Sequence, residues 1–329
     1  MRNLLLNDLM LNKINIGNIP TKIEYSQYLS KKYNLNFYLK RDDQTGIGLS
    51  GNKIRKLEYL FHDAIKKGYK NVITCGGIQS NHCRATAVLS RMVGIAPYLV
   101  LRGTEPEEYY DGNLFLNKLL DAQIFWVTPE EYKEQINEIL QQKADAIGSC
   151  YLIPEGGSNE IGYLGYLNAG LEILNQEKEM GVSFDYIFCA VGSGGTLGGL
   201  ILAKKIFNIN AKIVGVNVCD DASYFQSRIL RVLNSFIDKY NLELEITKDD
   251  IQIIDGFVGP GYAISTMEER QLIKEMAKNS GIFLDPVYTG KLMWALDSNL
   301  KKHEYKKSNV LFIHTGGIFG LFPQKELFF

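Results

Sequence analysis

The stretch VITCGGIQSNHCRATAVLSRMV, residues 72–93, carries the clearest structural signal in this chain. Its first four residues are apolar or β-branched and predict a short strand at 72–75, which the pair Gly76-Gly77 closes. Residues 81–93 then predict a helix. A strand that passes through a glycine turn into a helix is half of a βαβ unit, so the stretch predicts a parallel sheet covered by helices.

The rest of the chain alternates in the same way between short β-rich runs and longer amphipathic stretches. Near-continuous apolar runs, such as 186–191, are typical of strands that are buried on both faces of a parallel sheet. We predict strands at 37–39, 72–75, 98–101, 124–127, 151–153, 186–191, 213–218 and 310–314, and helices at 52–67, 81–93, 113–120 and 129–143. The expected fold is therefore α/β, with open, twisted, mainly parallel sheets and flanking helices. The polar stretch 241–250 is expected to be a surface loop.

Length and composition set the broad class. The chain has 329 residues, 46% of them hydrophobic, which is ample for a core and more typical of two domains than of one. No Pro/Gly/Ser-rich linker separates two halves, so two domains would have to interleave along the chain. The formal net charge is −1, which argues against nucleic acid as the main partner.

The sequence predicts a cytoplasmic protein without a membrane span. The apolar run at residues 4–6 is cut short by Asn7 and Asp8, so we expect no signal peptide, and no run of about 18 apolar residues occurs elsewhere. The five cysteines are scattered and form no CxxC pair, which predicts free thiols rather than a metal site or disulfides. They are Cys75, Cys83, Cys150, Cys189 and Cys219.

The turn at 76–81 has the features of an anion-binding loop. It follows a strand and opens a helix, so backbone N–H groups and the side chains of Ser80 and Asn81 would converge on an anionic ligand. An ordinary helix N-cap is the alternative, because Ser and Asn are both favoured there. Three consecutive polar residues, with Gln79 as the first, exceed what a cap needs.

A second glycine-rich turn, AVGSGGTLGGL at 190–200, also follows a strand and opens a helix. The glycines permit close backbone approach and Thr196 adds a hydroxyl, as in a phosphate cradle. The turn is no P-loop, because no Lys-Ser/Thr pair follows the glycines, and its likeness to a dinucleotide fingerprint is loose because Asp220 comes late. Such a turn can also serve only to pack a helix against a strand.

Lys53, in SGNKIRKLEYL at 50–60, lies at the start of a predicted helix. The positive end of the helix dipole repels an ammonium group, which would lower the pKa of Lys53 and favour the free amine that attacks an aldehyde. A solvated surface lysine is the alternative.

Two further segments, DPVYTGK at 285–291 and FIHTGG at 312–317, place a threonine and a glycine near a strand end or a helix start. Tyr288, with Tyr262 in GPGYA, could act as an acid–base phenol or simply pack. His82 and His314 have no neighbour at metal-ligand spacing and are expected to be structural.

Together these segments resemble the 1-aminocyclopropane-1-carboxylate deaminase and D-cysteine desulfhydrase family, a branch of the tryptophan-synthase-β-like (fold type II) pyridoxal-phosphate enzymes. The resemblance runs from about Ile19 to Phe322 and rests on KRDDQTG…LSGNKIRKLEYL followed by GGIQSNHCRATA. It implies a homodimer, with a large cofactor-binding domain of residues 1–52 and 162–329 and a small domain of residues 53–161.

The resemblance also implies roles for individual residues. Lys53 would hold pyridoxal phosphate as a Schiff base, beside Asn52, and Asn81 would bond the ring hydroxyl of the cofactor. Ser80 would meet the substrate carboxylate. The remaining implied positions are Gly192, Ser193, Gly194, Gly195 and Thr196 for the phosphate, Tyr262 and Tyr288 for catalysis, and Gln79, Asn81 and His82 near the substrate.

Two positions distinguish the subfamilies. Cyclopropane deaminases typically carry Glu after the tyrosine of DPVY and Leu in HxGG, where this chain has Thr289 and Thr315. A carboxylate at the pyridine nitrogen strengthens the electron sink that ring opening needs, whereas β-elimination tolerates a neutral threonine because hydrosulfide leaves. The expected activity is thus that of a carbon–sulfur lyase acting on D-cysteine. Cyclopropane deaminase, L-cysteate sulfo-lyase, a nicotinamide-dependent oxidoreductase and a non-catalytic binding protein remain alternatives.

Overall fold

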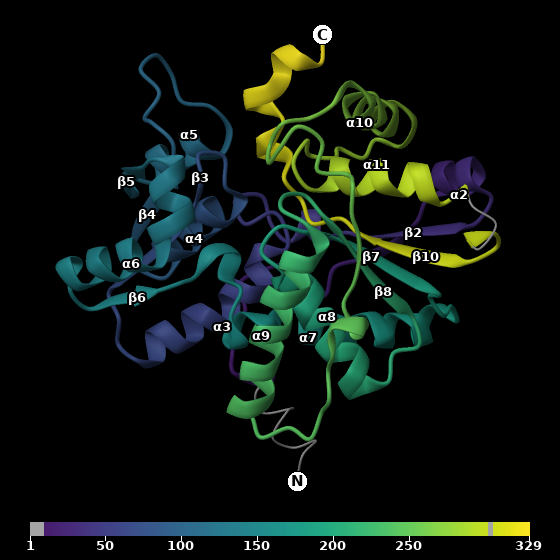
Figure 1. Cartoon of the computed structure of the whole chain (residues 1–329), viewed down its shortest axis with the longest axis horizontal. Coiled ribbons are helices and arrows are strands. Elements are labelled where there is room, and N and C mark those ends of the chain that lie inside the picture. Colours follow the sequence, from purple (N-terminus) through teal and green to yellow (C-terminus); the bar gives the residue numbers. More distant parts are fainter. Residues whose placement is uncertain (1–9, 302–304) are drawn as a thin grey trace.

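The structure, a computed structural model, describes residues 10–301 and 305–329 and contains two sheets with flanking helices (Figure 1). The larger sheet has strand order β1-β2-β10-β7-β8-β9, and every neighbouring pair in it is parallel except β1 with β2. Its strands are β1 (Ile23–Tyr25), β2 (Asn36–Lys40), β7 (Tyr186–Val191), β8 (Lys212–Asn217), β9 (Gln252–Ile254) and β10 (Asn309–Ile313). The predicted α/β class is confirmed.

The smaller sheet is wholly parallel, with order β5-β4-β3-β6. Its strands are β3 (Asn71–Gly77), β4 (Ala96–Arg102), β5 (Gln123–Val127) and β6 (Cys150–Leu152). All eight predicted strands are present in the two sheets within two residues of their expected ends. The edge strands β1 and β9, of three residues each, were not predicted.

The four predicted helices are confirmed as α3, α4, α5 and α6, and the two glycine turns both open helices, α4 and α8, as expected. The helices are α2 (Gln27–Tyr33), α3 (Lys53–Lys66), α4 (Asn81–Met92), α5 (Gly112–Leu119), α6 (Pro129–Ile147), α7 (Glu160–Met180), α8 (Gly195–Phe207), α9 (Ala222–Lys239), α10 (Met267–Ser280) and α11 (Thr289–Asn299). The stretch 241–250 is mostly exposed and contains only the short 3-10 turn Lys248–Asp250, as predicted for a surface loop. No described helix is long and apolar enough to cross a membrane. The run at residues 4–6 lies outside the described residues.

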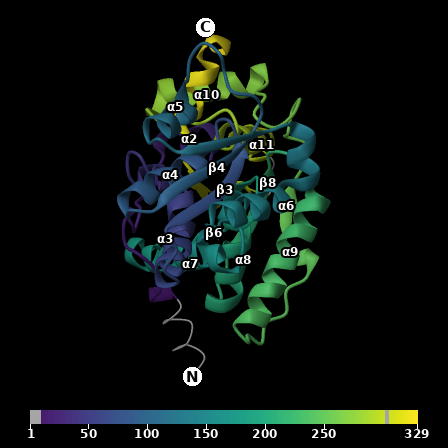
Figure 2. The same cartoon turned by 90° about the vertical axis from the view of Figure 1, so that its left-hand side faces the viewer.

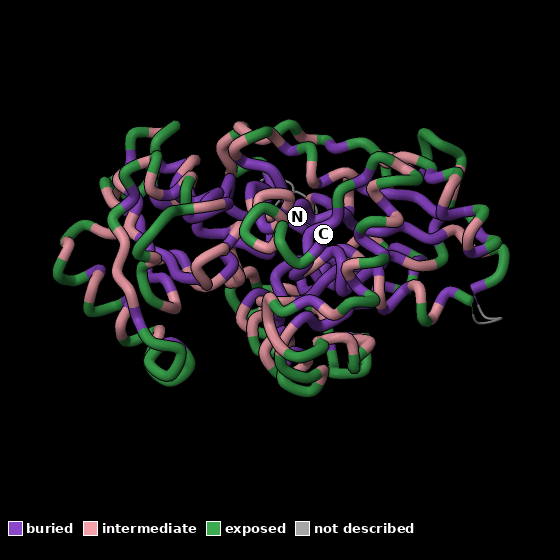
Figure 3. The backbone as a smooth tube through the Cα atoms, turned by 90° about the horizontal axis from the view of Figure 1, so that it is seen from above, coloured by how far each residue is buried: buried purple, intermediate pink, exposed green. Residues whose placement is uncertain are grey.

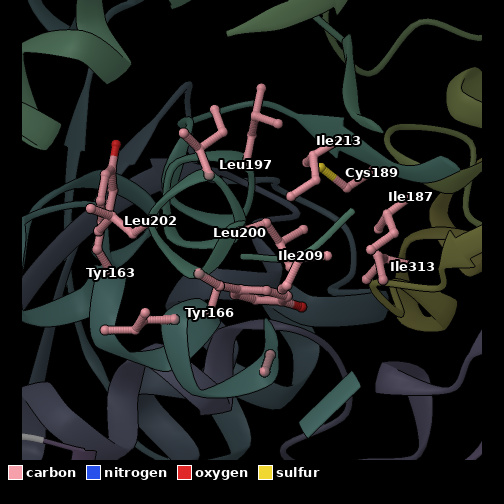
Figure 4. Close-up of a cluster of buried hydrophobic side chains, with 14 of the residues drawn as sticks. Tyr163, Tyr166, Ile187, Cys189, Leu197, Leu200, Leu202, Ile209, Ile213 and Ile313 are labelled. Carbon is pink, nitrogen blue, oxygen red and sulfur yellow. The ribbon is translucent and has the colours of Figure 1, made fainter. Parts of the chain in front are cut away.

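The larger sheet is buried on both faces, which explains its continuous apolar strands. On β7, Ile187 and Cys189 point toward α7, α8 and α9, whereas Phe188 and Ala190 point toward α2, α10 and α11. Figure 4 shows part of the first of these cores, where Ile213 of β8 lies beside Cys189 of β7. Alternation across a strand therefore divides the apolar side chains between two helical layers.

The smaller sheet is covered in the same manner, with α6 on one face and α4 and α5 on the other (Figure 2). Its strands come from one continuous part of the chain, whereas the strands of the larger sheet come from both sides of that part. Seen from above, buried residues fill two lobes separated by a narrower middle (Figure 3). This arrangement agrees with interleaved domains, and the boundaries at 53–161 stay a prediction.

Helix α3 lies between the two sheets and buries charged side chains. Arg55 and Glu58 are at most 2% exposed, although the sequence pattern places them on the polar face. Arg55 forms ion pairs with Asp42 at 2.8 Å and with Glu172 on α7 at 2.9 Å. These contacts fix the first turn of α3 against α7 and against the 3-10 turn Asp42–Gln44 that follows β2, and the position of Lys53 at the start of α3 is fixed with it.

Candidate active site

Ten of the fifteen sequence-predicted site residues line one pocket, whereas Gln79, Ser80, His82, Tyr262 and Thr289 are not among its described lining residues. The pocket lies beyond the carboxyl ends of β7 and β10, at the amino ends of α3, α4, α8 and α11. Its lining consists of Asn52, Lys53, Asn81, Ala190, Gly192, Ser193, Gly194, Gly195, Thr196, Tyr288 and Thr315. In α/β sheets ligands bind at this edge, so the location matches the expectation from the sequence.

Lys53 is the first residue of α3, and its amine faces the pocket. Burial lowers the pKa of Lys53 to about 8, and the nearby carboxylates of Glu155 and Asp285 only partly oppose this effect. The predicted direction is confirmed, although burial rather than the helix end is the main cause. The Nζ atom lies 5.7 Å from the centroid of the Tyr288 ring and donates no hydrogen bond to any described residue. About a tenth of this amine is therefore unprotonated at pH 7, far more than for an ordinary lysine.

The second glycine turn forms a backbone cradle at the start of α8. Gly194 has φ +88°, and a Cβ atom there would lie 2.6 Å from the Ile229 side chain, so a larger residue does not fit. The first turn of a helix leaves N–H groups without intrahelical partners, and Gly194, Gly195 and Thr196 at the start of α8 line the pocket, as in anion sites at helix amino ends. Thr196 accepts a hydrogen bond from the Asn52 amide at 2.9 Å, which ties the cradle to the start of α3.

Lys56, which sequence reasoning missed, lies next to the cradle although it is not among the described lining residues of the pocket. Its Nζ donates to the Gly156 carbonyl and lies 3.4 Å from the Ser158 hydroxyl, and a Cβ atom on Gly195 would lie 2.9 Å from it. Burial, together with the nearby Lys53, lowers the pKa of Lys56 well below its usual value. An anion in the cradle would stabilise the charged form of the Lys56 amine and so offset the free-energy cost of burying it. The sequence offered one signal for Lys56, which lies three residues after Lys53, because residues three apart lie on the same face of a helix.

The glycine turn at residues 76–81 is characterised by its side chains rather than by bare backbone N–H groups. Ser80 caps α4, since its hydroxyl accepts from the Cys83 N–H at 3.2 Å. Asn81 lines the pocket, and its Oδ1 accepts from the Asn113 amide at 3.0 Å. Gln79 turns away and bonds Asp111 and Asn113, beside a separate cavity of about 370 Å³.

The two histidines are both buried. His82 contacts the Thr74 hydroxyl at 2.9 Å and is not among the described pocket residues, and burial near Lys53 lowers its pKa well below the usual value. A role for Gln79 or His82 near the substrate therefore stays a prediction. His314 bonds the Phe283 carbonyl at 3.1 Å and accepts from the Gly316 N–H at 3.3 Å, so both ring nitrogens have partners.

Two tyrosines meet at the mouth of the site. The hydroxyls of Tyr262 and Tyr288 are 2.6 Å apart, and Tyr288 lines the pocket. Burial raises the pKa of both phenols, and for Tyr288 the adjacent Tyr262 hydroxyl adds to the shift. The pair is therefore protonated at neutral pH and can supply a proton to a departing group.

The two threonines that distinguish the subfamilies have different surroundings. Thr289 is fully buried, and its hydroxyl donates to the Asp285 carboxylate and accepts from the Asp285 N–H, both at 2.7 Å. It is absent from the described pocket lining, whereas Thr315 lines the pocket. The Thr315 carbonyl accepts from the Asn52 N–H at 3.1 Å, which fixes this loop beside Lys53. Of the two, Thr315 is better placed to approach a cofactor ring, and binding by Thr289 stays a prediction.

Comparison with known proteins defines the class. The family model for pyridoxal-phosphate-dependent enzymes matches residues 14–316. This chain belongs to that family, and the expected cofactor is thereby confirmed.

The more specific relatives agree with the resemblance described above. The chain is 45% identical over 322 residues to a Thermotoga maritima protein named "Putative 1-aminocyclopropane-1-carboxylate deaminase", covering 95% of this chain and 99% of the relative. It is 36% identical to the mitochondrial bifunctional D-cysteine desulfhydrase/1-aminocyclopropane-1-carboxylate deaminase of Arabidopsis thaliana, covering 94% and 79%. A crystal structure of a 1-aminocyclopropane-1-carboxylate deaminase homologue superposes with a TM-score of 0.88 at 34% identity, covering 98% of each chain.

The pocket fits pyridoxal phosphate on its own chemistry. A buried lysine with a lowered pKa suits attachment to an aldehyde. Opposite it, a cradle too tight for a Cβ atom on Gly194, with the buried amine of Lys56 beside it, suits a phosphate. Asn81 supplies an amide at the wall of the same pocket.

Proposed function

We propose that this enzyme eliminates hydrosulfide from D-cysteine. With one water consumed, the products are pyruvate, ammonia and hydrogen sulfide. The observation that carries the proposal is the pocket lining, in which Thr315 is present and none of the described residues is a carboxylate. A neutral neighbour leaves the cofactor ring a weaker electron sink, which is sufficient when the departing sulfur carries the electrons away.

The chain supplies binding and proton transfer. When bound, pyridoxal phosphate withdraws electrons from the α-carbon of the substrate. The Ser80 hydroxyl and nearby N–H groups hold the substrate carboxylate. Either Lys53 or a tyrosine removes the α-proton, and the Tyr262–Tyr288 pair lies where it can protonate the leaving sulfur.

A substrate panel tests the proposal. Purified enzyme is incubated separately with D-cysteine, L-cysteine, β-chloro-D-alanine, L-cysteate, D-serine and 1-aminocyclopropane-1-carboxylate, and sulfide and keto acids are measured. We expect D-cysteine to give sulfide and pyruvate in equal amounts, and Lys53→Ala to give neither. Release of α-ketobutyrate from the cyclopropane acid without sulfide from D-cysteine would contradict the proposal.

Cyclopropane deaminase is the second candidate, favoured by the names of the relatives. It predicts α-ketobutyrate from the cyclopropane acid. Thr315→Leu separates the two activities, because it introduces the residue typical of the deaminases in HxGG. Under our proposal this change lowers sulfide release without raising ring opening.

We further propose a homodimer that acts in the cytoplasm, with residues 53–161 as a small domain. The five cysteines, all free in the structure, support a reducing compartment. Light scattering on the purified holoenzyme tests the dimer, and a mass of one chain, 37.2 kDa, would contradict it.

A further inference from the structure

Asn113 is a fully buried amide whose polar atoms all have partners. It is the second residue of α5, and its backbone N–H donates to the Gln79 Oε1 at 2.8 Å. Its Nδ2 donates to the Gln79 carbonyl and to the Asn81 Oδ1, both at 3.0 Å. Its Oδ1 accepts from the Arg84 Nε at 2.8 Å. The side chain thus connects Arg84 to a residue of the pocket wall.

Arg84 fixes the direction of this chain of hydrogen bonds. It is 0% exposed and forms no ion pair with a described carboxylate, and its other nitrogens donate to the carbonyls of Gly48 and Ser50. Burial lowers the pKa of Arg84 to about 10, so the guanidinium stays charged at neutral pH. A guanidinium can only donate, so the Asn113 oxygen must face Arg84 and the Asn113 nitrogen must face Asn81.

The orientation of the Asn81 amide follows from the same reasoning. Because the Asn81 Oδ1 receives the Asn113 donor, the Asn81 Nδ2 remains for the pocket. An NH₂ group there can donate to an oxygen anion, whereas an amide oxygen in its place would repel one.

We propose that Arg84 and Asn113 are positioning residues that fix the Asn81 amide with its NH₂ group toward the pocket, where it donates to the ring oxygen of pyridoxal phosphate. This inference rests on the proposed role of Asn81 at the cofactor. It assigns a function to two residues outside the pocket.

Asn113→Asp tests the relay by replacing one NH₂ group with an oxygen. Arg84 gains an ionic partner, which offsets the loss of the donor to the Gln79 carbonyl. Asn81 must turn its amide to donate toward residue 113 and so present its oxygen to the cofactor. We expect the thermal midpoint to stay within a few degrees of the unmodified protein, while the dissociation constant of pyridoxal phosphate, measured by equilibrium dialysis of the holoenzyme, rises about tenfold or more. The pH midpoint of the visible cofactor band should move upward, because the ring oxygen loses a donor to its anionic form.

Matched variants keep the test decisive. Asn36→Asp alters the donor of another Asn–Asn pair, with Asn309 at 2.8 Å, at the opposite end of the large sheet, and should leave the cofactor band unchanged. Should Asn113→Asp fail to fold, Asn113→Ala replaces it, with an expected loss of about fivefold. If Asn81→Ala weakens cofactor binding and the Asn113 variants do not, the relay is wrong and the proposed function stands. If Asn81→Ala changes neither affinity nor band, both the relay and the proposed role of Asn81 are wrong.

Discussion

The two strand-to-helix turns of this enzyme both contribute to the pocket, one mainly through side chains and the other mainly through backbone N–H groups. The turn at 76–81 leads from β3 into α4, where Ser80 caps the helix and the Asn81 side chain lines the pocket. The turn at 192–196 leads from β7 into α8 and presents mainly backbone N–H groups, with Gly194 at φ +88°. The turn at 76–81 needs neighbouring residues to fix the Asn81 amide, because an amide has two possible orientations. The turn at 192–196 needs only the absence of a Cβ atom at Gly194. Substitutions should therefore harm the two turns in different ways.

The largest effect is expected at Lys53, which both turns surround. Lys53→Ala removes the amine that attaches the cofactor, so the visible band and all turnover should disappear while the protein stays folded. Borohydride reduction followed by peptide mass analysis locates the attachment site. Lys66→Ala, an exposed lysine in the last turn of the same helix, is the control and should keep both band and activity. A Lys53→Ala enzyme with normal turnover would refute the site.

A side chain added to the turn at 192–196 should weaken cofactor binding, because the turn has no room for it. Gly194→Ala combines a left-handed backbone, which costs an L-residue about 1–2 kcal/mol, with an overlap against Ile229, so we expect cofactor affinity to fall at least about tenfold. Gly68→Ala is the matched control, because Gly68 also has positive φ, +77°, but open space around it. Its unfolding free energy should fall by a similar strain cost with cofactor affinity unchanged. Equal affinities in the two variants would show that the cradle does not bind the phosphate.

The amine between the turns should show an unusual pH dependence. The pKa of Lys53 is lowered to about 8, so the reactive, unprotonated fraction increases as pH rises through 8. Between pH 7 and pH 9 that fraction rises from about a tenth to about nine-tenths, whereas an ordinary lysine stays almost fully protonated. The rate at which cofactor-depleted enzyme regains its visible band should thus increase about tenfold over this range. A midpoint near 10 would contradict the assigned pKa.

The side-chain turn should show the smallest effect, divided between stability and binding. Ser80→Ala removes the N-cap of α4, which costs about 1 kcal/mol of unfolding free energy, and it also removes the proposed carboxylate contact. We expect KM for D-cysteine to rise about fivefold. Thr128→Ala removes the N-cap of α6 and should lower stability equally without changing KM. If both variants leave KM unchanged, Ser80 is only a cap.

Sequence reasoning found those features whose cause is local. The glycine turns, the apolar strands and the start of α3 each depend on neighbouring residues, and they are where the pattern predicts them. Helix α7 was not predicted, because it packs against both α3 and α8 and so lacks a single apolar stripe. The contacts of Lys56 and Asn113 depend on side chains brought together by the fold. Thr289 bonds Asp285, only four residues away, but which of the two threonines reaches the pocket also depends on the fold.

The burial of helix α3 explains why the segment SGNKIRKLEYL is so specific a motif. Arg55, Lys56 and Glu58 are polar letters, yet each is nearly inaccessible and each has fixed partners, including Asp42 for Arg55 and Lys13 for Glu58. A surface charge can usually be exchanged for many others, but a buried and paired one tolerates few replacements. Almost every position of SGNKIRKLEYL is thereby restricted, the charged ones as tightly as the leucines. The restriction of this motif has a structural cause, because the first two turns of α3 are buried on every side.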